Sequence, residues 1–130
     1  MIKEAYVSFE LAKLLKEKGF NEECFALYNP DGVLIQSGIR LNNIQVGRVK
    51  GSYSAPTHQM AMAWLREVHN IHISVYVFNR ELPITDVPIS YTCDIATKKL
   101  SSQQGHLRGV WQSYEQTVEA ALKYSLENLI

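Results

Sequence analysis

Apolar residues recur every three or four positions in three segments of the chain, and this spacing predicts an amphipathic helix in each. The stripe of the middle segment is the widest, because Met60 and Ala63 lie beside it, so we expect this helix to be central and its Trp64 to be buried. A serine precedes the first and the last stripe, where its hydroxyl can accept a hydrogen bond from an unpaired backbone N–H. The middle stripe is formed by Ala61, Trp64, Leu65 and Val68. The expected helices are 8–18, 57–69 and 113–129.

Apolar and polar residues alternate strictly in two later segments, and a period of two predicts strands with one apolar face. Two earlier strands flank the stretch from Asn29 to Gly32, in which Asn-Pro-Asp-Gly is a strong turn signal. The polar stretches 40–56 and 97–110 are expected to be loops, the first with an irregular edge strand around 44–49. The expected strands are 24–28, 33–39, 71–78 and 89–96.

The predicted element order is α-β-β-α-β-β-α. Short connections favour antiparallel pairing within each ββ unit, and three amphipathic helices need an apolar sheet face to cover. We therefore expect a two-layer α+β fold with a roughly four-stranded, mainly antiparallel sheet and three helices. At 130 residues, the length predicts a single domain over residues 1–130.

Charge and cysteine content narrow the functional classes. The 13 basic and 13 acidic residues cancel, so no global field draws the chain to nucleic acid or to a membrane. The N-terminus lacks an apolar signal region, and no apolar run approaches membrane-spanning length. These features predict a soluble cytoplasmic protein with reduced thiols and no cofactor. A disulfide between Cys24 and Cys93 is possible but has no support in the sequence.

Three stretches carry a resemblance: SFELAKLLKEKGFNEEC (8–24), SAPTHQMAMAWLREVHN (54–70) and YEQTVEAALKYSLENLI (114–130). Together they are similar to a group of small proteins encoded in Bacteroidetes genomes and their prophages or mobile elements. The resemblance covers the three expected helices, about two-fifths of the chain. It implies an origin and a compartment, the bacterial cytoplasm, and it carries over no catalytic residue.

Residues capable of catalysis or metal binding form no recognised pattern. His69 and His72 are close in sequence but lie at a helix-to-strand junction, and a metal site needs three or four converging ligands. Cys24 stands beside Glu22 and Glu23, whose charges disfavour its thiolate. We assign no catalytic residue and no metal ligand. The sequence leaves three interpretations of function open. The third in order of preference is a small enzyme with a site in the sheet–helix cleft, and the other two follow below.

Acidic residues are absent from two long stretches, 33–66 and 95–114. Basic residues interleaved with aromatic ones, here Tyr53 and Trp111, are typical of sites that bind phosphate backbones and stack on bases. A nucleic-acid or polyanion site is the second interpretation, and it requires the two stretches to meet in space. Its candidate residues are Arg40, Arg48, Lys50, Ser52, Tyr53, Ser54, Lys98, Lys99 and Arg108.

The outward face of the strand 71–78 is the candidate interface. His72, Tyr76 and Phe78 point away from its Ile/Val face, and exposed aromatic side chains usually mark a contact surface. Homodimerisation through this face is plausible. The leading interpretation is a small non-enzymatic binding or accessory protein with a protein partner, linked to a phage or mobile element.

Overall fold

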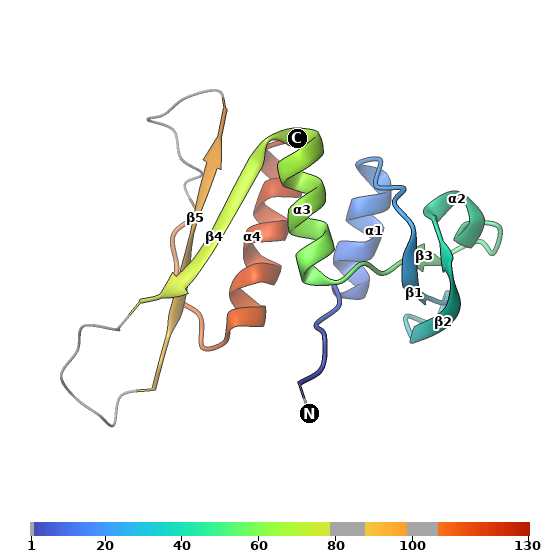
Figure 1. Cartoon of the computed structure of the whole chain (residues 1–130), viewed down its shortest axis with the longest axis horizontal. Helices are drawn as coiled ribbons and strands as arrows, with labels where there is room; N and C mark the ends of the chain where they lie inside the picture. Colours follow the sequence, from blue (N-terminus) through green and yellow to red (C-terminus); the bar gives the residue numbers. More distant parts are fainter. Residues whose placement is uncertain (1, 79–87, 99–106) are drawn as a thin grey trace. The chain divides into compact units, whose positions relative to one another are not determined.

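The computed structural model describes residues 2–78, 88–98 and 107–130 (Figure 1). The chain falls into two compact units, Met1–Ala61 and Met62–Ile130. The single domain over residues 1–130 stays a prediction, and each unit is described by itself below.

The first unit places a helix on one face of a small sheet. Helix α1 (Phe9–Glu17) begins after Ser8, whose Oγ accepts a hydrogen bond from the backbone N–H of Leu11, as the sequence predicts. The sheet has the strand order β2-β1-β3 and is antiparallel throughout. Its strands are β1 (Cys24–Tyr28), β2 (Leu34–Leu41) and β3 (Tyr53–Ser54).

The turn between β1 and β2 has the predicted chemistry. Asn29 Oδ1 accepts hydrogen bonds from the backbone N–H groups of Asp31 and Val33, and Gly32 adopts φ +78°. The expected first hairpin is therefore confirmed, with β2 extending to Leu41.

The expected edge strand around 44–49 is wrong, because a short helix, α2 (Asn43–Val46), forms there. Asn42 and Gln45 make a reciprocal capping box that satisfies the helix's first N–H groups. The strand that pairs with β1 lies further on, at Tyr53–Ser54.

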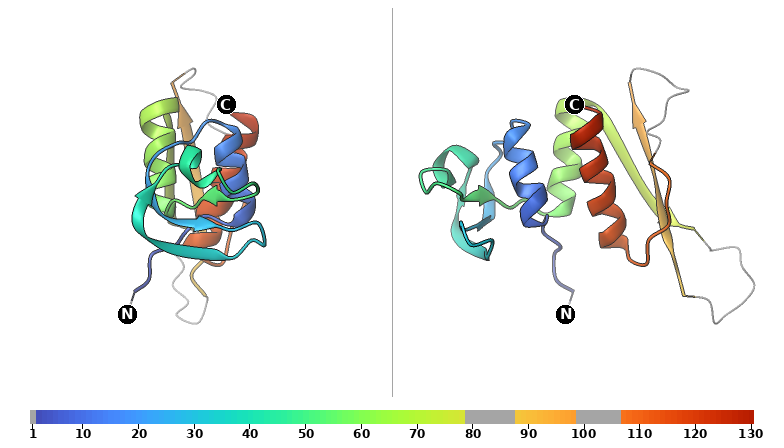
Figure 2. Two further views of the ribbon diagram at one scale, coloured as in Figure 1. Left: turned by 90° about the vertical axis from the view of Figure 1, so that its right-hand side faces the viewer. Right: turned by 180° about the vertical axis from the view of Figure 1, so that it is seen from behind.

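The second unit stacks helices on a two-stranded sheet. Helix α3 (His58–His69) crosses from the first unit and leads through Asn70, at φ +54°, into β4 (Ile71–Val77). Strand β4 pairs with β5 (Tyr91–Thr97) over seven residue pairs without a bulge. Helix α4 (Tyr114–Asn128), capped by Ser113, packs against both strands, and α3 lies on the same side of the sheet (Figures 1 and 2).

The α+β class and the two antiparallel ββ pairs are confirmed, whereas the single four-stranded sheet is wrong. The strands form one sheet of three and one of two. In the first sheet, β3 occupies the edge of β1 that β2 leaves open, so β1 has no edge left for a strand of the second hairpin.

The core of α3 follows the predicted stripe with one exception. Trp64 is 7% exposed and Leu65 is buried, as expected, but Val68 is 57% exposed. The ring of His69, rather than the side chain of Val68, packs edge-on against the ring of Trp64, with the two centroids 4.8 Å apart. Among the described helices, none is long and apolar enough to cross a membrane.

Candidate functional site

Two lysines and an aromatic cluster form a basic surface on the first unit. Lys13 Nζ lies 4.2 Å from the ring centroid of Phe9, and Lys16 Nζ lies 5.2 Å from that of Tyr53. The Phe9 ring packs edge-on against Tyr28 and Tyr53. Lysines three positions apart share one face of a helix, so the rings underneath fix both ammonium groups on the same side of α1.

Lys16 is also the centre of two open depressions in this unit. The first, of about 510 Å³, is lined by Lys13, Lys16, Glu17 and Tyr53. The second, of about 390 Å³, reaches Asn43 and Gly47 of the α2 region. A Cβ at Gly47 would lie 3.0 Å from Lys16 Nζ, so the missing side chain leaves room for this ammonium group.

Of the predicted polyanion-binding residues, Tyr53 is part of this surface. Arg48 and Lys50 are exposed between Gly47 and Tyr53 but line neither depression. We name the set formed by Lys13, Lys16 and Tyr53 the Lys16 surface. Lys13 and Lys16 were not predicted from the sequence, because they lie outside the acid-free stretches and share their helix with Glu10 and Glu17. The i, i+3 lysine spacing was the available signal.

Other candidates do not join the Lys16 surface. Ser52 and Ser54 are buried, and the Ser54 N–H is bonded to Asn43 Oδ1 at 2.8 Å. Their hydroxyls therefore do not lie on this surface, and their role as anion donors stays a prediction. The Arg40 guanidinium stacks 5.0 Å over the ring of Phe25, which points away from the buried β1 face that covers α1.

The remaining basic candidates belong to the second unit or to undescribed residues. Lys98 and Arg108 are exposed in the second unit, and Lys99 lies outside the described residues. The meeting of the two acid-free stretches stays a prediction.

The outer face of the three-stranded sheet carries exposed apolar side chains. Phe25 is 51% exposed and Ile35 is 42% exposed. Ile35 stands opposite Leu27 in the register, so these residues share the face away from α1. This surface was not predicted from the sequence, because a single sheet whose apolar side chains all meet helices leaves no such face exposed.

We name this surface the Phe25 face, consisting of Phe25, Leu27, Ile35 and Arg40. It combines an aromatic ring, aliphatic side chains and a guanidinium group held over that ring. Aromatic residues and arginine are enriched in the cores of protein–protein interfaces, whereas lysine and carboxylates are depleted there.

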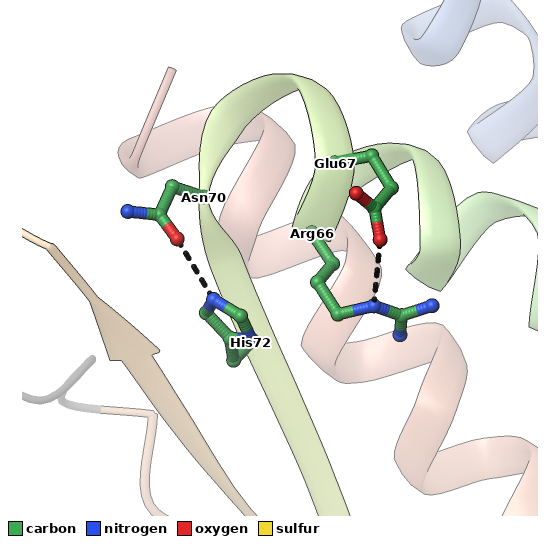
Figure 3. Close-up of polar contacts among 4 residues, drawn as sticks. All are labelled: Arg66, Glu67, Asn70 and His72. Atoms are coloured by element: carbon green, nitrogen blue, oxygen red, sulfur yellow. Dashed lines mark hydrogen bonds and ion pairs between the residues drawn. The ribbon is translucent and has the colours of Figure 1, made fainter.

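The alternation predicted for the second unit is confirmed. His72, Tyr76 and Phe78 are exposed, while Ile71, Cys93 and Ile95 are buried. The Tyr76 hydroxyl donates to Asp94 Oδ1 at 3.4 Å across the outer face. His72 Nε2 lies 2.8 Å from the Oδ1 of Asn70, which orients the imidazole at the start of β4 (Figure 3).

Both cysteines are free, buried thiols. Burial, with a smaller contribution from Glu22, raises the pKa of Cys24 to about 11. Burial and the neighbouring Asp94 raise the pKa of Cys93. The expected disfavoured thiolate of Cys24 is confirmed, although burial matters more than the like charge. A thiol with a raised pKa is a poor nucleophile at neutral pH.

Across residues 2–78, 88–98 and 107–130, no three or more His, Cys, Asp or Glu side chains gather as a metal site would require. Comparisons with protein-family models, with curated proteins and with solved structures find no match.

Proposed function

We propose that this chain is a non-enzymatic binding protein that recognises another protein through the Phe25 face. The observation that carries the proposal is the exposure of Phe25 beneath the guanidinium of Arg40 on an uncovered sheet face. A folded domain gains free energy by covering such side chains, at about 25 cal/mol for each Å² of apolar surface removed from water.

The composition of the Phe25 face favours a protein over other ligands. Phe25, Leu27 and Ile35 present apolar surface without a carboxylate or a lysine among them, and nucleic acid would require several cations for its phosphates. The cation–π contact also holds Phe25 and Arg40 in place before binding, which lowers the entropy lost when a partner docks.

Affinity capture with matched variants tests this proposal. The immobilised chain is incubated with extract of cells that carry its gene natively, beside Phe25→Ser and the control Ile2→Ser. Ile2 is 99% exposed but lies outside the Phe25 face. We expect a captured protein that Ile2→Ser retains and Phe25→Ser loses. Equal capture by all three chains, with circular dichroism showing each folded, would contradict the proposal.

A second candidate function is polyanion binding by the Lys16 surface. The ammonium groups of Lys13 and Lys16 stand over aromatic rings, and Tyr53 lines the same depression. Cations that contact phosphates beside a ring that stacks on a base are the recurring elements of single-stranded nucleic-acid sites.

Fluorescence anisotropy with labelled single-stranded DNA and RNA tests the second candidate. Each phosphate contact contributes about 0.7 to the slope of log K against log salt. The double variant Lys13→Ala/Lys16→Ala is expected to weaken binding and to flatten that slope, whereas Lys3→Ala leaves both unchanged. Absence of binding at low salt would exclude this candidate.

A place among phage or mobile-element proteins is also part of the proposal. It rests on the resemblance of the three helical segments. A small protein whose task is to bind a partner fits an accessory role in such an element.

A further inference from the structure

We propose that β4 is a self-association edge, which pairs antiparallel with β4 of a second copy about a twofold axis at Ser74. The two sheets would then join as one four-stranded sheet of order β5-β4-β4-β5. This inference concerns the second unit and is independent of the Phe25 face in the first.

The other edge of this two-stranded sheet is formed by β5, and it is partly covered, unlike the edge of β4. The outer edge of β5 is covered at its start, because Tyr91 and Trp111 exchange two backbone hydrogen bonds of 2.8 Å. Thr92 Oγ1 also donates to the carbonyl of Gly109 at 2.7 Å. Within the described part of the chain, β5 is the only strand that pairs with β4.

The register of the hairpin shows which backbone groups face this edge. The Phe78 N–H donates to the Ser90 carbonyl, and in an antiparallel pair the direction of these groups alternates along the strand. The backbone N–H and C=O groups of the even-numbered residues of β4 therefore point to β5. The backbone N–H and C=O groups of the odd-numbered residues point to the open edge, and these residues are Ile71, Ile73, Val75 and Val77.

One register pairs all four of these residues. With the axis at Ser74, Ile71 faces Val77 of the second copy and Ile73 faces Val75 of the second copy. Each such pair exchanges two hydrogen bonds, about eight in total. Shifting the pairing by two residues leaves one of the four without a partner in each copy, so the backbone favours the symmetric register.

The side chains are complementary in the same register. The strand reads Ile-His-Ile-Ser-Val-Tyr-Val, which is a palindrome in chemical type. On the face toward the helices, β-branched aliphatic residues meet one another. On the outer face, His72 meets Tyr76 of the second copy, and the two Ser74 side chains meet at the axis. Such cross-strand pairs stabilise sheets.

The edge also lacks the features that normally prevent this pairing. Natural edge strands carry lysine, proline or a bulge, and β4 has none of these and no charged residue. By contrast, β2, also an edge strand, carries Arg40 and a register shift opposite Cys24 to Ala26. Two identical copies of β4 therefore meet without like-charge repulsion.

The size of the contact sets its strength. Seven residues at about 3.4 Å each form an edge about 24 Å long. Because a sheet layer is about 10 Å deep, each copy contributes about 240 Å² of surface to the contact. Stable interfaces bury about 1,000 Å² or more in total. We therefore expect a weak dimer that forms only at high protein concentration.

Symmetric cysteine cross-linking of the full chain tests the axis. Residues in a non-hydrogen-bonded antiparallel pair have Cα atoms about 4.5 Å apart, within the range of a disulfide. Under mild oxidation, Ser74→Cys is expected to give a covalent dimer. The control Ala96→Cys, exposed on the same face but in β5, and the unmodified chain are expected to give no covalent dimer. Failure of Ser74→Cys to cross-link, or equal cross-linking of Ala96→Cys, would overturn the proposal.

Charge complementation provides a second readout, by sedimentation over a series of protein concentrations. Ser74→Lys and Ser74→Asp are each expected to be monomeric alone, because the twofold axis places like charges together. Their mixture is expected to form a heterodimer. A dimer that persists in Ser74→Lys would place the association elsewhere, and a mixture that stays monomeric would overturn the pairing of β4 with β4.

Discussion

Replacing Asn43 by alanine is expected to destabilise the first unit far more than an asparagine-to-alanine change usually does. Asn43 is 4% exposed, and its side chain connects three parts of this unit. Its Nδ2 donates to the Phe20 carbonyl at 2.7 Å after α1, and its Oδ1 accepts from the Ser54 N–H at 2.8 Å in β3. The substitution removes both partners while their backbone groups stay buried.

The magnitude follows from those two groups. A buried donor or acceptor left without a partner costs about 1–3 kcal/mol, so the two groups orphaned by Asn43→Ala should together cost about 2–6 kcal/mol of the free energy of unfolding. Asn21→Ala is the matched control, because Asn21 Oδ1 accepts a single hydrogen bond, 3.1 Å long, from the exposed Ile44 N–H. We expect the control to lose less than about 1 kcal/mol.

Urea unfolding followed by far-ultraviolet circular dichroism measures both variants. Asn43→Asp adds a third comparison, because it keeps the acceptor for Ser54 but replaces the donor to Phe20 with an oxygen. It should be at least as destabilising as Asn43→Ala, since a carboxylate then faces a carbonyl. A loss below about 0.5 kcal/mol for Asn43→Ala would refute the role of Asn43 as the polar link of this unit.

Two further predictions concern the second unit and the cysteines. Trp64→Ala should cost about 3–5 kcal/mol in urea unfolding, as for other large core residues, and a loss below about 1 kcal/mol would place Trp64 at the surface. Alkylation of Cys24 by iodoacetamide at pH 8 should be about 200-fold slower than that of a free thiol of pKa about 8.5, because its raised pKa leaves little thiolate. The rate should rise with pH up to about 11, and a plateau near pH 9 in peptide mass spectrometry would contradict the raised pKa.

Local chemistry explains which elements were predictable from the sequence. The caps at Ser8 and Ser113 and the turn at Asn29 depend on hydrogen bonds within a few residues, so the pattern of residue types contains them. The hairpin of β4 and β5 was equally accessible, because strict alternation fixes which face is buried.

Long-range pairing explains what was not predictable. Strand β3 has two residues, too few for any periodicity, and it exists because Leu27 and Tyr28 offer an open edge. Once β3 occupies that edge, no strand of the second hairpin can pair with β1. The Phe25 face follows from the same division, because a sheet of three strands with helix α1 on one side leaves its other side uncovered.

The Lys16 surface was missed for a different reason. Lys13 and Lys16 share a helix with two glutamates, so counting charges along the chain hides them. Lys13 contacts Phe9 four positions earlier on the same helix. The contact of Lys16 with Tyr53 depends on how α1 lies on the sheet, which the sequence pattern of α1 alone does not contain.

Photo-cross-linking from position 25 tests the proposed function most directly. A photoreactive phenylalanine analogue replaces Phe25 in cells that carry the gene natively, and a parallel chain carries it at Ile2. A binding role for the Phe25 face predicts a discrete covalent adduct with one other protein from position 25 and none of that size from position 2. No adduct from position 25, or the same adducts from both positions, would contradict it.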